Sequence, residues 1–225
     1  MSVDEEYLQQ VMRTVSHDIS SVVRAAVGFS RLIVNHYSDC LDDKALGWLV
    51  LMEQEGKKAQ TQLVSLSRYA RLYGDIDMES EVNLKTLCDE VVADCSNQYP
   101  QFSVCVEDLP TVMGNKELWR QYFMEMIFNS AEYSSGECRV YTKVLADKDN
   151  RISLIIEDNG IGLDSNRLDA AVRPFRVLDP ESKANGMGLP IAKRIVELHS
   201  GVFSVISIPE TTPGLQVCAE ITPVF

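Results

Sequence analysis

The sequence predicts an α+β chain in which an antiparallel helical hairpin precedes an α/β sandwich, a mixed sheet covered by helices. Two observations predict this fold. Apolar residues recur at steps of three and four over residues 5 to 34 and again over 46 to 73, as amphipathic helices require. After residues 74 to 77, short β-rich runs alternate with helical patterns. Hydrophobic residues make up 45% of the 225, enough for a real core.

The two N-terminal helices are expected to pair around a polar turn at residues 35 to 43. Their apolar seam would leave both flanks of the hairpin uncovered, and a second copy would cover them. We therefore predict a homodimer held by a four-helix bundle. The domain boundary is placed so that residues 1–76 form the helical domain and residues 77–225 form the second domain.

The second domain is predicted to begin with a helix that Asn83 caps at its N-terminus. The later elements are expected in this order: a strand at 102–106, a helix at 116–133, an antiparallel pair at 139–144 and 152–157 around a turn at 147–150, a helix at 189–199, and a closing hairpin at 202–208 and 215–221. Gly201 is expected in the C-cap position of the last helix. The weak pattern over residues 166 to 185 suggests a mobile lid.

The charge and composition exclude several classes of protein. The net charge of −12 argues against a nucleic-acid surface, since no basic stripe offsets the acid. The six cysteines form no CxxC pair, so metal-ligand spacing and a redox motif are absent. No apolar run is long enough to span a bilayer, and the N-terminus is acidic where a signal peptide would be basic, so we expect a cytoplasmic protein without membrane insertion.

The stretch Asp158 to Gly162, with the letters DNGIG, follows an apolar run that reads as a strand. A fixed carboxylate next to two alternate glycines offers an acid beside a backbone bare enough for a flat ligand. This stretch therefore predicts the floor of a nucleotide pocket.

His17 is predicted to face solvent, away from the apolar seam of the first helix, because each residue advances about 100°. Arg13, Ser21 and Arg24 share its face, and Asp18 lies on its flank. A carboxylate that accepts a hydrogen bond from Nδ1 would leave Nε2 as a nucleophile. The alternative is an inert surface histidine.

Two further motifs gain meaning from their neighbours. Asn129 follows Glu125 by one helical turn, so an amide oxygen for Mg²⁺ and a carboxylate for water or a proton would share a helix face. The run Gly186 to Leu189 precedes a helix, whose free N–H groups suit a phosphate. A capping amide and an ordinary loop are the alternatives.

Taken together, the motifs resemble the H, N, G1, F and G2 boxes of two-component sensor histidine kinases, and the H-box region is most similar to the phytochrome-like branch. The matching stretches, in chain order, are Ser16 to Ile19, Glu125 to Ser134, Asp158 to Gly162, Arg173 to Arg176, and Gly186 to Ile191. Their order and spacing fit the family over nearly the whole chain.

The resemblance implies a dimerisation and histidine phosphotransfer domain followed by an ATP-binding domain of the gyrase and chaperone ATPase (GHKL) superfamily. By it, His17 takes the γ-phosphate with Asp18 as base, Asn129 binds Mg²⁺, and Asp158 accepts the adenine amino group. The other ATP-site residues that it implies shape the pocket or the lid: Gly160, Gly162, Phe175, Arg176, Lys183, Gly186, Gly188 and Leu189. The resemblance also implies a water-activating role for Glu125 and a water-orienting role for Ser21.

Three positions depart from the family pattern. Val22 replaces a frequent proline, Glu132 stands where the family usually has Lys or Arg, and Ala184 replaces the first glycine of the G2 stretch. Lys183 could restore some of the missing positive charge.

The sequence thus predicts a histidine kinase that transfers the γ-phosphate of Mg-ATP to His17 and then to an aspartate of a response-regulator receiver domain. The input would come from an upstream sensor protein or domain. Two alternatives remain: a catalytically weak homologue that acts as a histidine phosphotransferase or response-regulator phosphatase, and a GHKL-type ATPase driven by Glu125.

Overall fold

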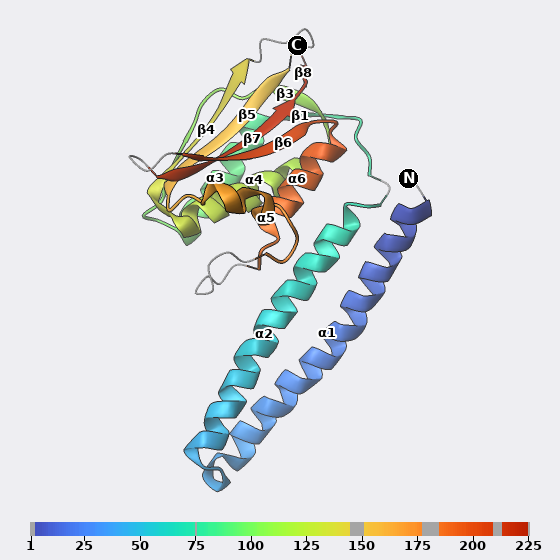
Figure 1. Cartoon of the computed structure of the whole chain (residues 1–225), viewed down its shortest axis with the longest axis vertical. Helices are drawn as coiled ribbons and strands as arrows, with labels where there is room; N and C mark the ends of the chain where they lie inside the picture. The colour runs from blue at the N-terminus through green and yellow to red at the C-terminus, as the bar shows by residue number, and fades with distance from the viewer. Residues whose placement is uncertain (1–2, 75, 145–150, 177–184, 209–212, 225) are drawn as a thin grey trace. The chain divides into compact units, whose positions relative to one another are not determined.

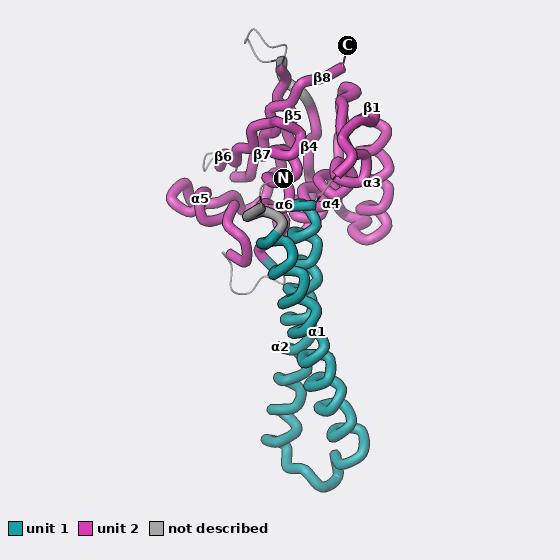
Figure 2. Tube along the Cα trace, turned by 90° about the vertical axis from the view of Figure 1, so that its right-hand side faces the viewer, with its two compact units in different colours: residues 1–75, 183–185 teal, residues 76–182, 186–225 magenta. Residues whose placement is uncertain are grey.

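The computed structural model describes residues 3–74, 76–144, 151–176, 185–208 and 213–224. The chain divides into two compact units (Figure 2). The first contains Met1–Asp75 and Lys183–Asn185, and the second contains Ile76–Ser182 and Gly186–Phe225.

The first unit is a helical hairpin made of α1 (Val3–Tyr37) and α2 (Asp43–Arg71), joined through a short 3-10 helix, η1 (Ser38–Cys40). Asp42 caps α2, since its side chain accepts a hydrogen bond from the N–H of Ala45 at 2.7 Å. The two helices run antiparallel side by side in Figure 1, as predicted. Ser30 ties them together by donating to the carbonyl of Leu49 at 2.9 Å.

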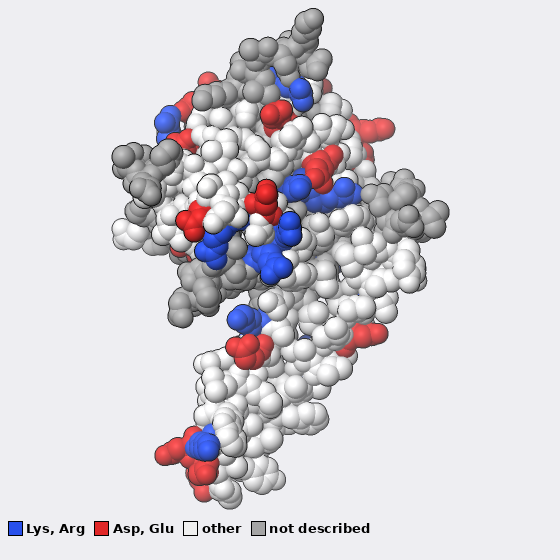
Figure 3. Space-filling view, viewed as in Figure 1, with Lys and Arg blue, Asp and Glu red and all other residues white. Residues whose placement is uncertain are grey.

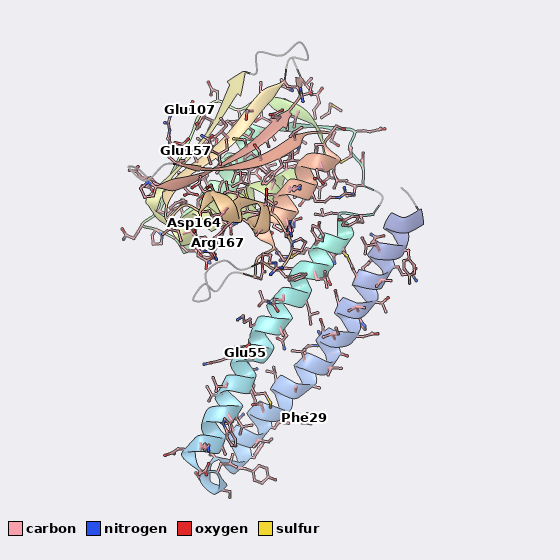
Figure 4. The ribbon with its side chains drawn as sticks, viewed as in Figure 1. Phe29, Glu55, Glu107, Glu157, Asp164 and Arg167 are labelled. Carbon is pink, nitrogen blue, oxygen red and sulfur yellow. The ribbon has the colours of Figure 1, made fainter. Side chains whose placement is uncertain are left out.

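Much of the apolar surface of this hairpin stays exposed within one copy of the chain. The exposed large apolar side chains on the two helices include Leu8, Val11, Val15, Ile19, Val22, Phe29, Leu32, Ile33, Trp48, Leu51, Met52 and Val64. Figure 4 labels Phe29 on α1 and Glu55 on α2. None of the helices in the described part of the chain combines the length and the apolar character that a membrane span needs.

The second unit is built on a five-stranded sheet in the order β2-β4-β5-β7-β6. The strands are β2 (Ser103–Val106), β4 (Ser134–Val144), β5 (Ile152–Gly160), β6 (Val202–Ile208) and β7 (Gly214–Ile221). Only the β2–β4 pair among these is parallel, so the sheet is mixed, as predicted. The predicted pairing of residues 139–144 with 152–157 is confirmed, and so is the closing hairpin.

Three longer helices cover one face of this sheet (Figure 1): α3 (Leu84–Gln98), α4 (Lys116–Tyr133) and α6 (Gly188–Leu198). The predicted cap of α3 is confirmed, because the Asn83 side chain accepts from the N–H of Thr86 at 2.8 Å. The core between helices and sheet includes Leu87, Val91, Trp119, Tyr122, Phe123, Ile127, Val140, Leu154, Ile156, Ile191 and Ile195.

The opposite face of the sheet carries a polar network instead of helices. Glu157 accepts hydrogen bonds from Tyr141 Oη at 3.0 Å and from Gln216 Nε2 at 2.7 Å. Glu107, which Figure 4 labels together with Glu157, accepts from Arg139 at 2.7 Å. Since successive strand residues point to opposite faces, Asp158 points toward the helices.

The sequence did not predict a second sheet of three short strands. These strands are β1 (Ser80–Asn83), β3 (Thr111–Gly114) and β8 (Pro223–Val224), in the order β1-β3-β8. Runs of two to four residues are too short for an alternating pattern to stand out. This sheet pairs residues near the start of the unit with residues near the end of the chain.

The end of α6 differs from the prediction. His199 is the C-cap, and the residue with left-handed backbone is Ser200, at φ 58°, rather than Gly201. The N–H of Ser200 bonds the carbonyl of Glu197 at 3.0 Å and that of Gly201 bonds Val196 at 2.9 Å, which is the Schellman pattern. Gly201 is needed for space instead, because an added Cβ would lie 2.5 Å from the carbonyl oxygen of Glu220.

The predicted lid segment, residues 166 to 185, is partly described. Its first part holds a 3-10 turn, η2 (Ser165–Arg167), and a single helical turn, α5 (Leu168–Ala171). Figure 4 labels Asp164 and Arg167 here. Residues 177–184, with Lys183 and Ala184, and the predicted turn at 147–150 lie outside the described residues.

Candidate functional site

His17 lies on the exposed side of α1, as its position in the sequence predicts. Its side chain is 81% exposed and that of Asp18 is 72% exposed. The Nδ1 atom of His17 lies 3.1 Å from Oδ1 of Asp18. Because an ionised carboxylate can only accept, this contact assigns the ring proton to Nδ1 and leaves the lone pair of the neutral ring on Nε2.

Ser21 lies one helical turn after His17 and is also exposed. Its hydroxyl donates to the carbonyl of Asp18 at 2.7 Å, so its proton is used within the helix. The hydroxyl oxygen keeps acceptor capacity for a water molecule. The water-orienting role of Ser21 stays a prediction.

Asp158 lies within β5, because the strand runs to Gly160 rather than ending at residue 157 as predicted. Its carboxylate accepts three hydrogen bonds. Its Oδ1 accepts from the N–H of Gly160 at 2.9 Å and of Leu215 at 3.2 Å. Its Oδ2 accepts from the Ser130 hydroxyl at 3.1 Å. Burial raises the pKa of Asp158 above its usual value, and these three bonds oppose that rise.

The glycines around Asp158 are required by space and by backbone conformation. An added Cβ at Gly160 would lie 2.6 Å from the carbonyl oxygen of Tyr133. Gly162 has a left-handed backbone, at φ 65°. A Cβ at Gly214 would collide with the carbonyl oxygen of Asp158. The strand end is therefore backbone packed against backbone, which holds the carboxylate in place.

Asn129 on α4 reaches the start of α6. An added Cβ at Gly188 would lie 2.6 Å from Nδ2 of Asn129, so only glycine allows this approach. Glu125 lies one turn earlier on α4 and is half-buried. The neighbours in sequence Asn129 and Ser130 thus contact two different motifs, Gly188 and Asp158.

The first turn of α6 presents backbone N–H groups. The helix begins at Gly188, and its N-cap Met187 makes no side-chain cap. The N–H groups of Gly188 and Leu189 have no carbonyl available within the helix, whereas that of Ile191 bonds Met187 at 3.0 Å. Such N–H groups at the positive end of a helix favour an anion such as phosphate.

Phe175, within the predicted lid segment, lies next to Gly186, the residue that follows the segment. The N–H of Phe175 donates to the carbonyl of Gly186 at 3.1 Å, and both residues have left-handed backbones, at φ 61° and 69°. An added Cβ at Gly186 would lie 2.7 Å from the backbone of Arg176. The predicted lid residues Phe175 and Arg176 are therefore anchored beside the segment that leads into α6.

Four of the predicted motifs belong to the second unit, and two contacts on α4 link three of them. The sequence did not identify Ser130, Gly214 or Leu215 as parts of the site. The hydroxyl of Ser130 lies inside the predicted N-box stretch, but only the fold brings it to Asp158. Gly214 and Leu215 come from the other end of the domain, and sequence spacing carries no sign of that contact.

The predicted Mg²⁺ would have to bind to the donor atoms that these residues offer. The described residues hold no group of three or more His, Cys, Asp or Glu side chains that could bind an ion. Mg²⁺ commonly keeps several waters and binds through one or two protein oxygens together with substrate phosphates. The Asn129 amide oxygen, close to the first turn of α6, fits that mode of binding.

Comparison with protein families agrees with this geometry. Residues 114–223 match the family of histidine kinase-, DNA gyrase B-, and HSP90-like ATPases. The matched region runs from the end of β3 to β8 and contains every predicted nucleotide-site residue. The second unit is therefore similar in sequence to the ATP-binding domains of this family over those residues.

Curated relatives extend the match to most of the chain. The chain is 22% identical over 94% of its length to the cell-division control histidine kinase PdhS of Brucella anthropi, and 24% identical over 90% to the phytochrome-like protein Cph1 of Synechocystis. It spans only 22% and 28% of those proteins.

Solved structures share the fold. Full-length ShkA, crystallised with AMPPNP, matches with a TM-score of 0.65 and 18% identity over 96% of this chain and 46% of ShkA. The histidine kinase AdeS of Acinetobacter baumannii matches with a TM-score of 0.59 and 15% identity over 93% of this chain and 98% of AdeS. The prediction of a sensor histidine kinase catalytic core with a GHKL ATP-binding domain is confirmed.

Proposed function

We propose that this chain transfers the γ-phosphate of ATP to His17 and then to an aspartate of a response-regulator receiver domain. The proposal rests mainly on two contacts made by consecutive residues of α4. Ser130 bonds Asp158 at 3.1 Å, and Asn129 lies against Gly188, so a site for a base and a site for phosphates meet at consecutive residues.

The chemistry at His17 is an in-line displacement. Nε2 attacks the γ-phosphorus, the N–P bond forms as the bond to the β-γ bridging oxygen breaks, and ADP leaves with that electron pair. The ring gains positive charge during the attack. The Asp18 carboxylate, 3.1 Å from Nδ1, would stabilise this charge and accept the Nδ1 proton.

On the second unit, Asp158 would accept the adenine amino group, and the N–H groups of Gly188 and Leu189 would bind phosphate oxygens. Arg176 and Lys183 would add positive charge from the lid, and Phe175 would close over the nucleotide. Mg²⁺ held by Asn129 and the phosphates would neutralise charge on the transferring group. Because His17 belongs to the other unit, transfer also requires the two units to dock.

We further propose that the exposed apolar side chains of α1 and α2 pair two copies of the chain in a four-helix bundle. Arg13, Ser21 and Arg24 are exposed near His17, and the positive charge of the two arginines suits an acidic receiver pocket. The location we propose is the cytoplasm, with an upstream sensor protein or domain as the source of the signal.

One observation favours a second candidate. Glu132 is exposed on the last turn of α4, so a negative charge stands where related kinases usually have a positive one. This charge would weaken ATP use and favour a phosphotransferase or a response-regulator phosphatase that still relies on His17.

Incubation with radiolabelled ATP and Mg²⁺ tests these functions. Wild type should acquire an acid-labile label, and His17→Gln should acquire none. His36→Gln is the matched control, because His36 is also an exposed histidine of α1, and it should label like wild type. Asp158→Asn should lose ATP binding but still accept phosphate at His17 from a phosphorylated receiver.

Each alternative has its own outcome. Measurable ATP binding without label on wild type supports the phosphotransferase or phosphatase. Steady phosphate release that survives His17→Gln supports an ATPase driven by Glu125. Normal labelling of Asp158→Asn would refute the assignment of the pocket.

A further inference from the structure

Asp158 has nearly all of its acceptor capacity occupied before any ligand binds. An ionised carboxylate offers about four acceptor directions. Among the residues that the structure describes, two backbone N–H groups take Oδ1 and the Ser130 hydroxyl takes one direction on Oδ2. The direction that is left is the second one on Oδ2, so a ligand amino group must approach beside the Ser130 hydroxyl.

Ser130 is itself held in place. It is only 3% exposed, on the face of α4 that packs toward the sheet. Cys138, the partner of Asp158 across the β4–β5 pair, is also buried. Burial raises the pKa of Cys138 to about 12, so the group is a thiol at neutral pH. The Ser130 hydroxyl gives its proton to Oδ2 of Asp158.

We propose that Ser130 is a specificity-determining residue for the nucleotide base, which fixes the free acceptor direction of Asp158 so that the site selects a 6-amino purine. This inference rests on the proposed ATP function and adds to it a residue outside the predicted set. Ser130 acts by positioning Asp158 and by occupying the direction that a second, differently placed donor would otherwise use.

The geometry gives a reason for selectivity as well as affinity. A 6-oxo purine presents an acceptor to the same direction, and two acceptors repel. A purine without a 6-substituent has no donor for Oδ2 of Asp158, so the orientation of that oxygen does not affect its affinity. Loss of the Ser130 hydroxyl should therefore weaken only ligands that carry the 6-amino group, whereas a general loosening of the pocket would weaken all of them.

The test measures binding of three diphosphates to the full chain by calorimetry, in the same Mg²⁺ buffer: ADP, inosine diphosphate and purine-riboside diphosphate. The variants are Ser130→Ala and Ser130→Cys, the second of which keeps a weak donor. Ser153→Ala is the matched control. Ser153 is a buried serine like Ser130, but it lies on β5 and points to the face of the sheet opposite Asp158.

For Ser130→Ala we expect the Kd of ADP to rise by about 5- to 10-fold, the equivalent of one hydrogen bond, and that of purine-riboside diphosphate to change by less than about twofold. Ser130→Cys should fall between wild type and Ser130→Ala. Ser153→Ala should bind all three as wild type does.

An equal loss for ADP and purine-riboside diphosphate would overturn the proposal, because it would show a merely structural role. An unchanged preference for ADP in both Ser130 variants would also overturn it while leaving the ATP function intact. If wild type bound none of the three, the proposed function itself would fail, and this inference with it.

Discussion

The two units of the chain differ in how much of their apolar surface they can bury alone. On the hairpin, Val22, Phe29 and Trp48 are 68%, 64% and 62% exposed. In the second unit, the large residues Trp119, Tyr122, Phe123 and Leu154 are almost fully buried. Both units have clear apolar patterns in the sequence. The pattern alone therefore does not show whether a single chain can bury the apolar residues of each unit.

This difference separates two kinds of stability. The second unit can cover its sheet with α3, α4 and α6, whereas a pair of helices has only one mutual seam. The stability of the hairpin should therefore depend on protein concentration, and that of the second unit should not. The chain has two tryptophans, Trp48 on α2 and Trp119 on α4, so each unit carries its own fluorescent reporter.

The largest effect is expected in the core of the second unit. Leu154→Ala removes a fully buried side chain from the central strand β5, so it should lower the free energy of unfolding by about 2 to 5 kcal/mol. Urea unfolding followed by Trp119 in a Trp48→Phe background measures it. The hairpin, followed by circular dichroism and sedimentation, should keep its association. A loss of association in Leu154→Ala would contradict the independence of the two units.

The next largest effect is expected in the hairpin. Burial of a large apolar side chain stabilises by about 1.5 to 3 kcal/mol, and a symmetric interface contains it twice. Phe29→Ser should therefore raise the dissociation constant of the dimer by roughly 100-fold or more, as measured by sedimentation equilibrium. Val202→Ser, which removes an exposed apolar side chain from β6, is the control and should associate as wild type does. A wild-type chain that is monomeric at micromolar concentration would refute the dimer.

A smaller effect is expected at His199, whose ring links α6 to the start of α4. Its Nδ1 lies 2.7 Å from the carbonyl oxygen of Ile195, which can only accept, and its Nε2 accepts from the N–H of Asn115 at 3.2 Å. The ring must therefore be neutral. Trp119 packs against it with ring centroids 4.6 Å apart. Burial lowers the pKa of His199.

The sign of the pH dependence follows. The folded pKa lies below the unfolded value of about 6.5, so the stabilisation is complete above that pH and declines as the pH falls below it, by at most about 1.4 kcal/mol per pH unit for one proton. Urea unfolding of the second unit between pH 7.5 and 5 measures this slope. His199→Gln should have a shallower slope, and comparing the two removes contributions from groups that both share, such as Asp158. Equal slopes would contradict the assignment.

The sequence was sufficient for the elements whose patterns are long. The helices at 3–37 and 116–133 repeat their apolar period often enough to be recognised, and so do the strand pairs 139–144 with 152–157 and 202–208 with 215–221. The three-stranded sheet was missed, because its strands pair residues about 30 and 110 positions apart and each is four residues or fewer. Such strands are fixed by partners far along the chain.

The candidate site divides in the same way. Asp158, Asn129 and the glycines belong to short motifs of neighbouring residues, so the sequence was enough to propose them. Ser130, Gly214 and Leu215 act on Asp158 only through the fold, since a hydroxyl in a helix and a residue at a strand start carry no local mark of that partner. The pairing of β5 with β7 brings Gly214 and Leu215 to Asp158, and the packing of α4 on the sheet brings Ser130.

The smallest effect is expected at the end of α6, where Ser200 has the left-handed backbone that the sequence reading assigned to Gly201. A residue with a Cβ costs about 1 kcal/mol more than glycine in this conformation. Ser200→Gly should therefore stabilise the second unit by roughly 0.5 to 1 kcal/mol, since glycine also loses more entropy on folding. Gly201→Ala should destabilise it, because its Cβ would press on the carbonyl of Glu220. Thermal unfolding of both variants decides which residue carries the conformational strain, and a stabilising Gly201→Ala would reverse the assignment.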